Sequence, residues 1–298
     1  MTALKGRLGI DSARIPQTDR HGVIWLGRGN LTVDAGTLRF VTPGGGELEA
    51  GDYALPFQMV SCLVLEPGTS VTHDVVRLCT AHGTGLVFVG EGGVRMYGAM
   101  PFGPDASARG RRQARLWADA AARLRVVRRL YAFRLGEVFP DASIEVLRGM
   151  EGARAKRTYE LVAQEYGLTW RGRRYDRDDP LSADVPNQAL NHVSTAVVAA
   201  AQVATAVSGA IPQLGFIHEE SGIAFSLDVA DMFRDSVTLP VAFAAAKAFQ
   251  RERRGAGTKL EPLCRKHAGG TLQRERVVTK MIDKIKELLD GDDSRGDP

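Results

Sequence analysis

Cysteine is scarce in this 298-residue sequence, and the three that occur, Cys62, Cys79 and Cys264, form no CxxC pair. Their spacing excludes a cysteine zinc site and a disulfide framework, and it favours a reduced, cytoplasmic setting. The N-terminal stretch lacks the apolar core that a signal peptide needs. The most apolar run, residues 196–211, is too short to span a bilayer, so we expect a buried helix and no membrane partner.

Nucleotide-binding motifs are also missing. The sequence contains neither GxxxxGK[ST] nor GxGxxG, so nucleotide hydrolysis and dinucleotide binding have no support.

Apolar residues make up 44% of the chain and charged residues 25%, which is ordinary for a globular protein. The length allows two domains or one large one, each able to bury a core of its own.

Positive charge is concentrated in one segment. Residues 109–177 hold 17 Lys and Arg against 8 Asp and Glu, a net of +9, which leaves −5 for the rest of a chain whose total is +4. A basic face of this kind suits nucleic acid, because neutralising phosphates supplies most non-specific affinity. An arginine-rich helix surface facing solvent explains the same count equally well.

The first hundred residues have the pattern of short strands separated by Gly, Asn and Pro. Runs such as GVIWLG, NLTVDA, TLRFVT and GLVFVG predict a β-sandwich-like domain over residues 1–100. A single helix interrupts it, with Thr69 and Ser70 as candidate N-cap residues and Gly83 as the C-cap.

Helical spacing follows a Gly- and Pro-rich linker at residues 101–110. We expect a larger all-α catalytic domain over residues 111–290 and a polar tail at residues 291–298, which makes the fold class α+β. One helix should carry an apolar stripe that includes Leu116, Ala120 and Leu130, and a second should begin at Asp141. The expected helices cover residues 111–139, 141–167, 187–209, 226–235, 238–250 and 271–290.

Residues 214–233, LGFIHEESGIAFSLDVADMF, place one imidazole and several carboxylates within an apolar stretch. Asp228 and Asp231 lie three residues apart and would share a helix face, ten or more residues after His218. Oxygen and imidazole ligands suit Mn²⁺ or Mg²⁺. On these residues alone an alternative stands, in which His218 is a satisfied loop residue and Asp228 is a charge favoured by the helix N-terminus.

Several motifs in the same order resemble the CRISPR-associated spacer integrase of type I-E systems. They are LEPGTSVTHDVVRLCTAHGTGLVFVGEGGVRMY, LRGMEGARAKRTYELVAQEYGLTWRGRRYD and GFIHEESGIAFSLDVADMFRDSVTLPVAF. The resemblance spans about residues 21 to 290. It implies a metal-dependent DNA integrase and endonuclease that joins the 3′-hydroxyl ends of captured DNA to the CRISPR repeat by transesterification.

The resemblance also implies roles for individual residues. Glu151, His218 and Asp231 match the positions that bind one Mg²⁺ or Mn²⁺, and Asp228 matches a further functional carboxylate that supports them or handles a proton. Taken alone, Glu151 is better explained as an ion-pair partner of Arg148 and Arg154 on its own helix, and only the other two motifs favour a metal ligand. Glu219 and Glu220 have no counterpart in the family pattern and are interpreted as surface charges.

DNA contacts and partners follow from the same resemblance. Arg95 and Arg148 match positions near DNA, and Tyr175 matches one that reads the motif beside the captured segment; ordinary surface or core roles are the alternatives. The sequence departs from the family pattern at two DNA-contacting positions: Arg28 stands where a stacking tyrosine is expected, and Pro180 where relatives can carry tryptophan. The implied partners are duplex and forked DNA, a second copy of the chain forming a homodimer through the β domain, and a small adaptation subunit in a heterohexamer.

Two rival functions remain open at this level. One is a stand-alone metal-dependent nuclease that cuts branched DNA without the small subunit. The other is a non-catalytic DNA-binding scaffold whose carboxylates serve only ion pairs.

Overall fold

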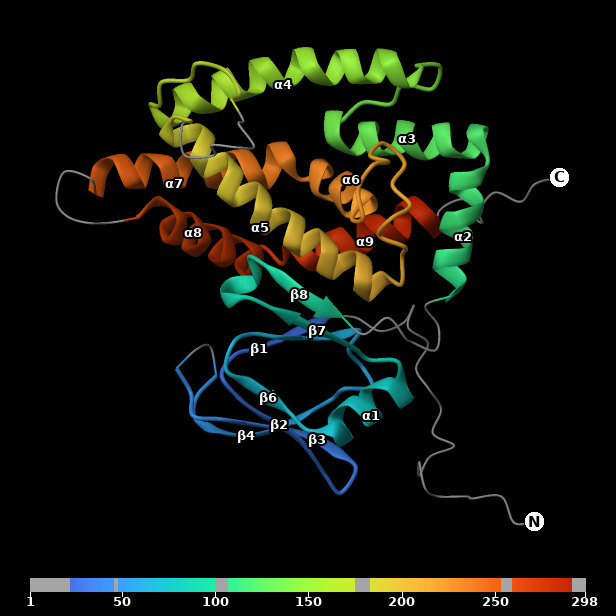
Figure 1. The fold of residues 1–298 in the computed structure, drawn as a ribbon, viewed down its shortest axis with the longest axis vertical. Helices are drawn as coiled ribbons and strands as arrows, with labels where there is room; N and C mark the ends of the chain where they lie inside the picture. The colour runs from blue at the N-terminus through green and yellow to red at the C-terminus, as the bar shows by residue number, and fades with distance from the viewer. Residues whose placement is uncertain (1–21, 46–47, 100–106, 175–182, 253–258, 291–298) are drawn as a thin grey trace. The chain divides into compact units, whose positions relative to one another are not determined.

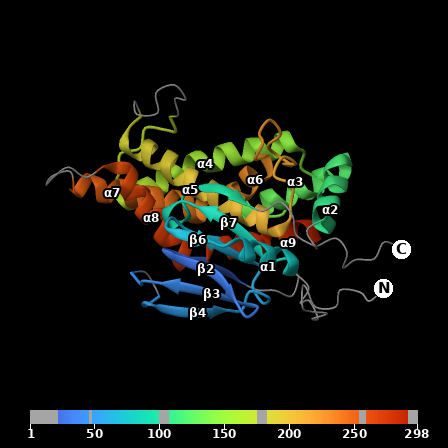
Figure 2. The same cartoon turned by 60° about the horizontal axis from the view of Figure 1, so that its bottom comes forward.

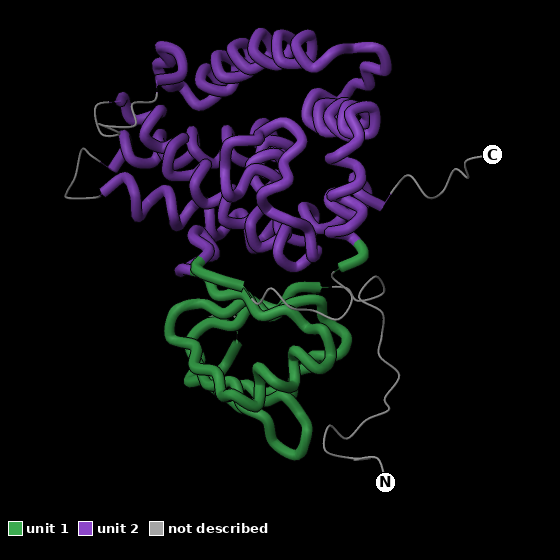
Figure 3. Tube along the Cα trace, turned by 45° about the vertical axis from the view of Figure 1, so that its right-hand side comes forward, with its two compact units in different colours: residues 1–89, 97–108 green, residues 90–96, 109–298 purple. Residues whose placement is uncertain are grey.

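The computed structural model describes residues 22–45, 48–99, 107–174, 183–252 and 259–290, and the chain divides into two compact units. The first unit contains residues 1–89 and 97–108, and the second contains residues 90–96 and 109–298 (Figure 3). Each unit has its own secondary structure and its own core.

The first unit contains two four-stranded sheets (Figures 1 and 2). The first has the order β1-β5-β7-β8, in which β1, β5 and β7 run parallel, and the second has the order β4-β3-β2-β6. The strands are β1 (Val23–Leu26), β2 (Gly29–Asp34), β3 (Thr37–Thr42), β4 (Gly51–Leu55), β5 (Cys62–Leu65), β6 (Thr69–Val71), β7 (Gly85–Val89) and β8 (Met96–Ala99).

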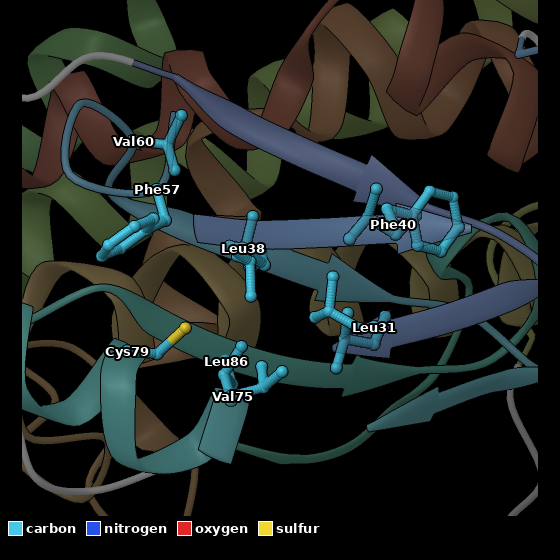
Figure 4. Packing of buried hydrophobic residues seen from close by; sticks show 11 residues of the cluster. Leu31, Leu38, Phe40, Phe57, Val60, Val75, Cys79 and Leu86 are labelled. Atoms are coloured by element: carbon cyan, nitrogen blue, oxygen red, sulfur yellow. The ribbon is translucent and has the colours of Figure 1, made fainter. Parts of the chain in front are cut away.

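Both sheets of the first unit contribute to one apolar core. Leu31 and Phe40 from one sheet, and Leu63 and Leu86 from the other, belong to the same buried cluster as Val75 of helix α1 (His73–His82) (Figure 4). The helix ends at Gly83, whose φ of +70° suits glycine, as the sequence predicted. It begins later than predicted: Thr69 and Ser70 belong to strand β6, and Thr72 occupies the N-cap position.

The second unit is almost entirely helical. Its helices are α2 (Ser107–Ala118), α3 (Ala120–Leu135), α4 (Ile144–Tyr166), α5 (Val185–Ser208), α6 (Ala224–Met232), α7 (Leu239–Glu252), α8 (Leu260–Arg274) and α9 (Val277–Asp290), and α2 begins at the boundary between the units. Two four-stranded sheets near the N-terminus followed by a mostly helical region confirm the α+β prediction at that level.

Helix α5 is the central helix of this unit. Figure 1 shows it running between the other helices, and it packs against α6, α7, α8 and α9. Within the described part of the chain, it is the one helix long and apolar enough to cross a membrane by composition. Small buried residues along it, such as Ala200 and Ala204, allow its neighbours to approach closely. The buried helix was expected, but the expectation that its apolar run is too short to span a bilayer is wrong for the whole helix, because Val185–Ser208 extends that run by about three turns at its start.

Several helix boundaries differ from prediction. Residues 111–139 form two helices, because Asp119 leaves the helical conformation and its carboxylate caps α3 through the N–H of Ala122. The prediction that Ala120 belongs to the apolar stripe is therefore wrong, because Ala120 is exposed at the start of α3. Helix α4 is capped by Ser143 rather than Asp141.

Two strands and one α-helix of the described residues were not predicted from the sequence. They are strands β4 and β6 and helix α8, whose residues 260–274 overlap only the start of the predicted 271–290 helix. Strand β4 is half-exposed and β6 has three residues, so neither carries the buried apolar run that identifies a strand.

Candidate functional site

A loop between α5 and α6 carries the predicted imidazole, and helix α2 holds the loop in place. Gln113 is fully buried and its amide donates to the carbonyls of Ile211 (3.0 Å) and Leu214 (2.9 Å), while its oxygen accepts the Ile211 N–H (2.7 Å). The indole of Trp117 donates to the carbonyl of Gly215 at 2.9 Å. The loop is thus tied to a helix about a hundred residues earlier in the chain.

Gly215 lets this loop fold back tightly on itself. A Cβ at this position would collide with the carbonyl oxygen of His218 and would lie 2.7 Å from the Cβ of Ala224. These neighbours belong to backbone or to the base of a buried helix, so they cannot swing aside. The glycine of the GFIH motif is therefore required for the position of His218.

Asp228 fixes the loop from the opposite side. Its carboxylate, only 1% exposed in the middle of α6, accepts the backbone N–H groups of Phe216 (2.6 Å), Ile217 (3.1 Å) and His218 (3.0 Å). The burial of a charge is tolerated here because both oxygens are hydrogen-bonded. Since Asp228 is the fifth residue of α6, the alternative that it merely complements a helix N-terminus is wrong.

The imidazole of His218 is oriented by the same carboxylate. Its Nδ1 lies 2.7 Å from Oδ1 of Asp228, and its Nε2 lies 4.0 Å from Oδ2 of Asp231. The hydrogen bond to Asp228 raises the pKa of His218, with further support from the charges of Asp228 and Asp231 against the opposing effect of burial. Nδ1 of His218 is thus hydrogen-bonded to Asp228, and Nε2 is directed toward Asp231.

Glu151 and Asp231 come from different helices and meet at one guanidinium. Arg134 of α3 forms an ion pair with Glu151 of α4, and its Nη1 lies 3.8 Å from Oδ2 of Asp231 on α6. Asp231 is also paired with Arg234. The side chain of Arg134 is only 6% exposed, against 24% for Glu151 and 21% for Asp231.

The structure answers the local alternative for Glu151. Arg148 donates to the carbonyl of Ile217 at 3.4 Å, and Arg154 pairs with Glu137 at 2.7 Å. Glu151 pairs instead with Arg134, 17 positions earlier in the chain. The interpretation of Glu151 as an ion-pair partner of its helix neighbours is therefore wrong.

A buried tyrosine adjoins this ion pair. Tyr131 lies one turn before Arg134 on α3, and its hydroxyl is buried with no hydrogen bond of good geometry. Burial and the nearby Glu151 charge raise the pKa of Tyr131 to about 12, so the hydroxyl keeps its proton at neutral pH. It remains a potential donor beside the Glu151 carboxylate.

The donor set suits a divalent cation although the side chains are not gathered around one point. Among the described residues, no group of three His, Cys, Asp or Glu side chains is placed to share a metal ion. A guanidinium is instead the cation next to both Glu151 and Asp231, while Nε2 of His218 approaches Asp231. Two carboxylates already neutralised by a cation, with an imidazole beside them, fit Mg²⁺ or Mn²⁺ in chemistry.

A cavity of about 660 Å³ opens beside this cluster within the second unit. His218, Asp231 and Arg234 line it together with polar residues of α5, among them Asn191 and Thr195. A cavity of this size, lined by carboxylate, imidazole and guanidinium groups, has room for a nucleotide unit and charge for its phosphate.

The other predicted residues lie apart from the cluster or outside the described residues. Arg95 is exposed and pairs with Glu261 at 3.6 Å. Arg148 lies one turn before Glu151 and touches the His218 loop through Ile217. Arg28 is exposed between β1 and β2. Tyr175 and Pro180 lie outside the residues that the structure describes.

The two loop glutamates are exposed, as interpreted from the sequence. Glu219 nevertheless has a partner, since it pairs with Arg123 of α3. Arg123 also donates to the carbonyl of Phe216 through Nη2 (3.0 Å) and lies over the ring of Trp117. This contact ties the His218 loop to α3.

Sequence reasoning missed Arg134, Gln113 and Trp117. In the sequence, Arg134 is one of many arginines on a basic helix, and Gln113 and Trp117 belong to no motif. Only their contacts across the fold identify them.

Solved structures share this fold. The crystal structure of the TtCas1–DNA complex matches with a TM-score of 0.78 and 30% identity, covering 94% of this chain and 99% of that one. No protein-family model matches the sequence. The likeness in fold, at 30% identity over nearly the whole chain, therefore defines the class as proteins with the fold of TtCas1.

Curated relatives give the family. The chain is 39% identical over 280 residues to CRISPR-associated endonuclease Cas1 3 of Methanospirillum hungatei, covering 94% of this chain and 90% of the relative. It is 35% identical over 279 residues to CRISPR-associated endonuclease Cas1 of Escherichia coli, covering 92% and 87%. The chain belongs to the Cas1 family of CRISPR-associated endonucleases, which confirms the resemblance at family level.

Proposed function

We propose that this protein is a divalent-metal-dependent DNA integrase and endonuclease of CRISPR adaptation, of type I-E. It joins the 3′-hydroxyl ends of captured DNA to the CRISPR repeat by transesterification. The observation that supports this is the convergence of Glu151 and Asp231 on one cation, with Nε2 of His218 beside them and an adjoining cavity that His218, Asp231 and Arg234 line. Family membership supports a nuclease that acts in a CRISPR system.

Glu151, His218 and Asp231 would hold Mg²⁺ or Mn²⁺. When bound, the metal supplies Lewis-acid stabilisation to the scissile phosphate and its leaving oxygen. His218 would offer Nε2, since Asp228 engages Nδ1 and holds the ring in one tautomer. Imidazole beside two carboxylates makes support by Mn²⁺ especially favourable.

The reaction exchanges one phosphodiester for another and needs no external energy source. The 3′-hydroxyl oxygen of the captured DNA forms a bond to a repeat phosphorus, and the bond from that phosphorus to the repeat 3′-oxygen breaks. The proton lost by the attacking hydroxyl is balanced by the one that the leaving oxygen gains. With water in place of the hydroxyl, the same site cuts DNA, which accounts for an endonuclease activity.

The cationic side chains around the cavity would position the DNA backbone. Arg234 lines the cavity beside Asp231, and a guanidinium can bind a phosphate through two parallel hydrogen bonds. Arg95 and Arg148 are exposed enough to meet phosphates further along the duplex, and Tyr175 would stack on an unpaired base. A related protein, TtCas1, has been solved in complex with DNA.

The assembly would contain more than one chain. A homodimer formed through the β-rich first unit, with two such dimers flanking a dimer of the small adaptation subunit, would give a heterohexamer in the cytoplasm. The distance between active sites would then set the length of the inserted DNA.

An integration assay tests this function directly. The protein is incubated with short duplex DNA and a supercoiled plasmid carrying the repeat, with and without the small subunit, in Mg²⁺ or Mn²⁺. Joining at the repeat ends only with the small subunit is the expected result. Cutting of branched DNA without the subunit would instead favour a stand-alone nuclease, and binding without strand chemistry would favour a scaffold.

Asp231→Ala sharpens the assay. The variant should keep duplex binding but lose joining, because it removes a metal ligand without removing the basic surface. Glu287→Gln, which changes an exposed carboxylate on α9, is the matched control and should join DNA normally. Joining at the normal rate by Asp231→Ala would end the ligand assignment.

A further inference from the structure

Arg134 is a buried charge whose partners lie on two other helices. It pairs with Glu151 on α4 and approaches Asp231 on α6, where Arg234 is the nearer cation. Arg134 therefore neutralises Glu151 and adds to the neutralisation of Asp231, the two carboxylates that the proposed function assigns to metal. A divalent cation and the guanidinium would compete for the same oxygens. One of them has to yield for the other to bind fully.

Two unsatisfied groups near this ion pair suggest where the guanidinium goes. The Nε of Arg134 is buried without a hydrogen-bond partner, and so is Oδ1 of Asp235. Asp235 lies in a π-helical turn, Arg234–Thr238, that directly follows α6. Asp235 follows Asp231 by four residues, about one helical turn, and Nη1 of Arg134 already lies 3.8 Å from Oδ2 of Asp231. In agreement with this placement, the charges of Arg134 and Arg234 oppose the rise that burial causes in the pKa of Asp235.

We propose that Arg134 is an exchangeable internal counter-ion: it pairs with Glu151 and Asp231 until a divalent cation binds, and then moves its guanidinium toward Asp235. This inference rests on the proposed metal site and adds to it a residue pair that controls metal affinity. Arg134 and Asp235 are positioning residues, because neither holds the metal nor touches the DNA.

The exchange has an electrostatic basis. Two partly buried carboxylates without a cation would repel each other, so Arg134 stabilises the metal-free protein. When a metal replaces the guanidinium, a buried arginine would be left unpaired at high cost unless a new acceptor is available. Asp235 supplies that acceptor, and its own unmet hydrogen bond is satisfied by the same movement.

The two residues should therefore affect metal binding in opposite directions. Binding of Mn²⁺ is measured by calorimetry and by the metal-induced rise in the unfolding temperature, without DNA. Arg134→Gln should bind Mn²⁺ about tenfold more tightly than the wild type, because its competitor is gone. Asp235→Asn should bind about tenfold more weakly, because the displaced guanidinium loses its acceptor. In an Arg134→Gln background, Asp235→Asn should have no further effect.

Matched variants separate this inference from its alternatives. Arg125→Gln removes an exposed arginine from the same helix and should leave Mn²⁺ affinity unchanged. If Arg134→Gln bound Mn²⁺ more weakly than the wild type, Arg134 would orient the ligands rather than compete, and the inference would be overturned while the metal site stood. If Glu151→Gln left Mn²⁺ binding unchanged in the wild type and in Arg134→Gln, the metal site itself would fail.

A measurement on the wild type covers the case in which Arg134→Gln does not fold. In an NMR titration with diamagnetic Mg²⁺, the Nε–H signal of Arg134 should shift, and its exchange with water should change as the guanidinium leaves Glu151. A signal that stays unchanged at saturating Mg²⁺ would show a fixed guanidinium and overturn the exchange.

Discussion

His218 and Asp228 are joined twice: the imidazole Nδ1 lies 2.7 Å from the Asp228 carboxylate, and the His218 backbone N–H donates to the same oxygen at 3.0 Å. Because that carboxylate also accepts two neighbouring backbone N–H groups, it acts as an acceptor, and Nδ1 carries the proton. In the neutral ring the lone pair is then on Nε2, the nitrogen nearer Asp231. Asp228 thus decides which nitrogen the site presents.

Asp228→Asn should destabilise the protein and misplace His218. An amide offers one acceptor oxygen and brings two donors against backbone N–H groups, so at least one buried donor loses its partner. We expect a loss of about 2–3 kcal/mol in the free energy of unfolding, measured by urea denaturation. Glu287→Gln, at an exposed ion pair, should cost less than about 1 kcal/mol. Equal stability of the two variants would contradict this account of the buried network.

Gly215→Ala should disturb the His218 loop because the new methyl group would overlap the His218 carbonyl and Ala224. We expect a loss of about 1–3 kcal/mol in unfolding free energy, with a shift of the His218 ring signals in NMR. Gly222→Ala is the matched control in the same loop, since nothing lies within 4 Å of its added Cβ. If Gly215→Ala proved as stable as Gly222→Ala, the close approach would be refuted.

His192 should make stability fall at acid pH. Burial lowers its pKa, and the Arg95 charge adds to this, while Glu261 opposes it. A histidine with a lowered pKa takes up its proton more readily in the unfolded chain. The contribution of neutral His192 to the free energy of unfolding is therefore fully present above pH 6.5. It is lost as the pH falls through the pKa of His192 in the folded protein. In His192→Gln, the slope of stability against pH just below 6.5 should be shallower than in the wild type. An unchanged slope would exclude His192 as its source.

Arg148→Ala should weaken DNA binding equally for all sequences. If Arg148 neutralises one phosphate, its loss should reduce the slope of log affinity against log salt by about 1. Arg77→Ala, at an exposed arginine of the first unit, should leave the slope unchanged. Fluorescence anisotropy with duplex DNA at several salt concentrations measures both. If the slope of log affinity against log salt changed by the same amount in both variants, the prediction that Arg148 contacts a DNA phosphate would be contradicted.

Local patterns determined much of the architecture. Turn residues and short apolar runs located most strands, and Gly83, Gly167 and Gly209 marked helix ends that the structure reproduces. Strands and helix ends of this kind depend on interactions among a few residues close together in the chain, so the sequence alone is enough to predict them. The break at Asp119 was missed because one capping hydrogen bond outweighs a helical pattern that continues on both sides.

By itself the sequence determined the family, the α+β class and the residues that could carry chemistry, since Glu151, His218 and Asp231 lie in recognisable motifs. Only the tertiary structure decided their environment: Asp228 holds the loop, Arg134 stands between the carboxylates, and Gln113 anchors the turn from a distant helix. The reason is physical. A buried charge must be neutralised or hydrogen-bonded by whatever the fold brings near it, and spacing along the chain does not specify those neighbours.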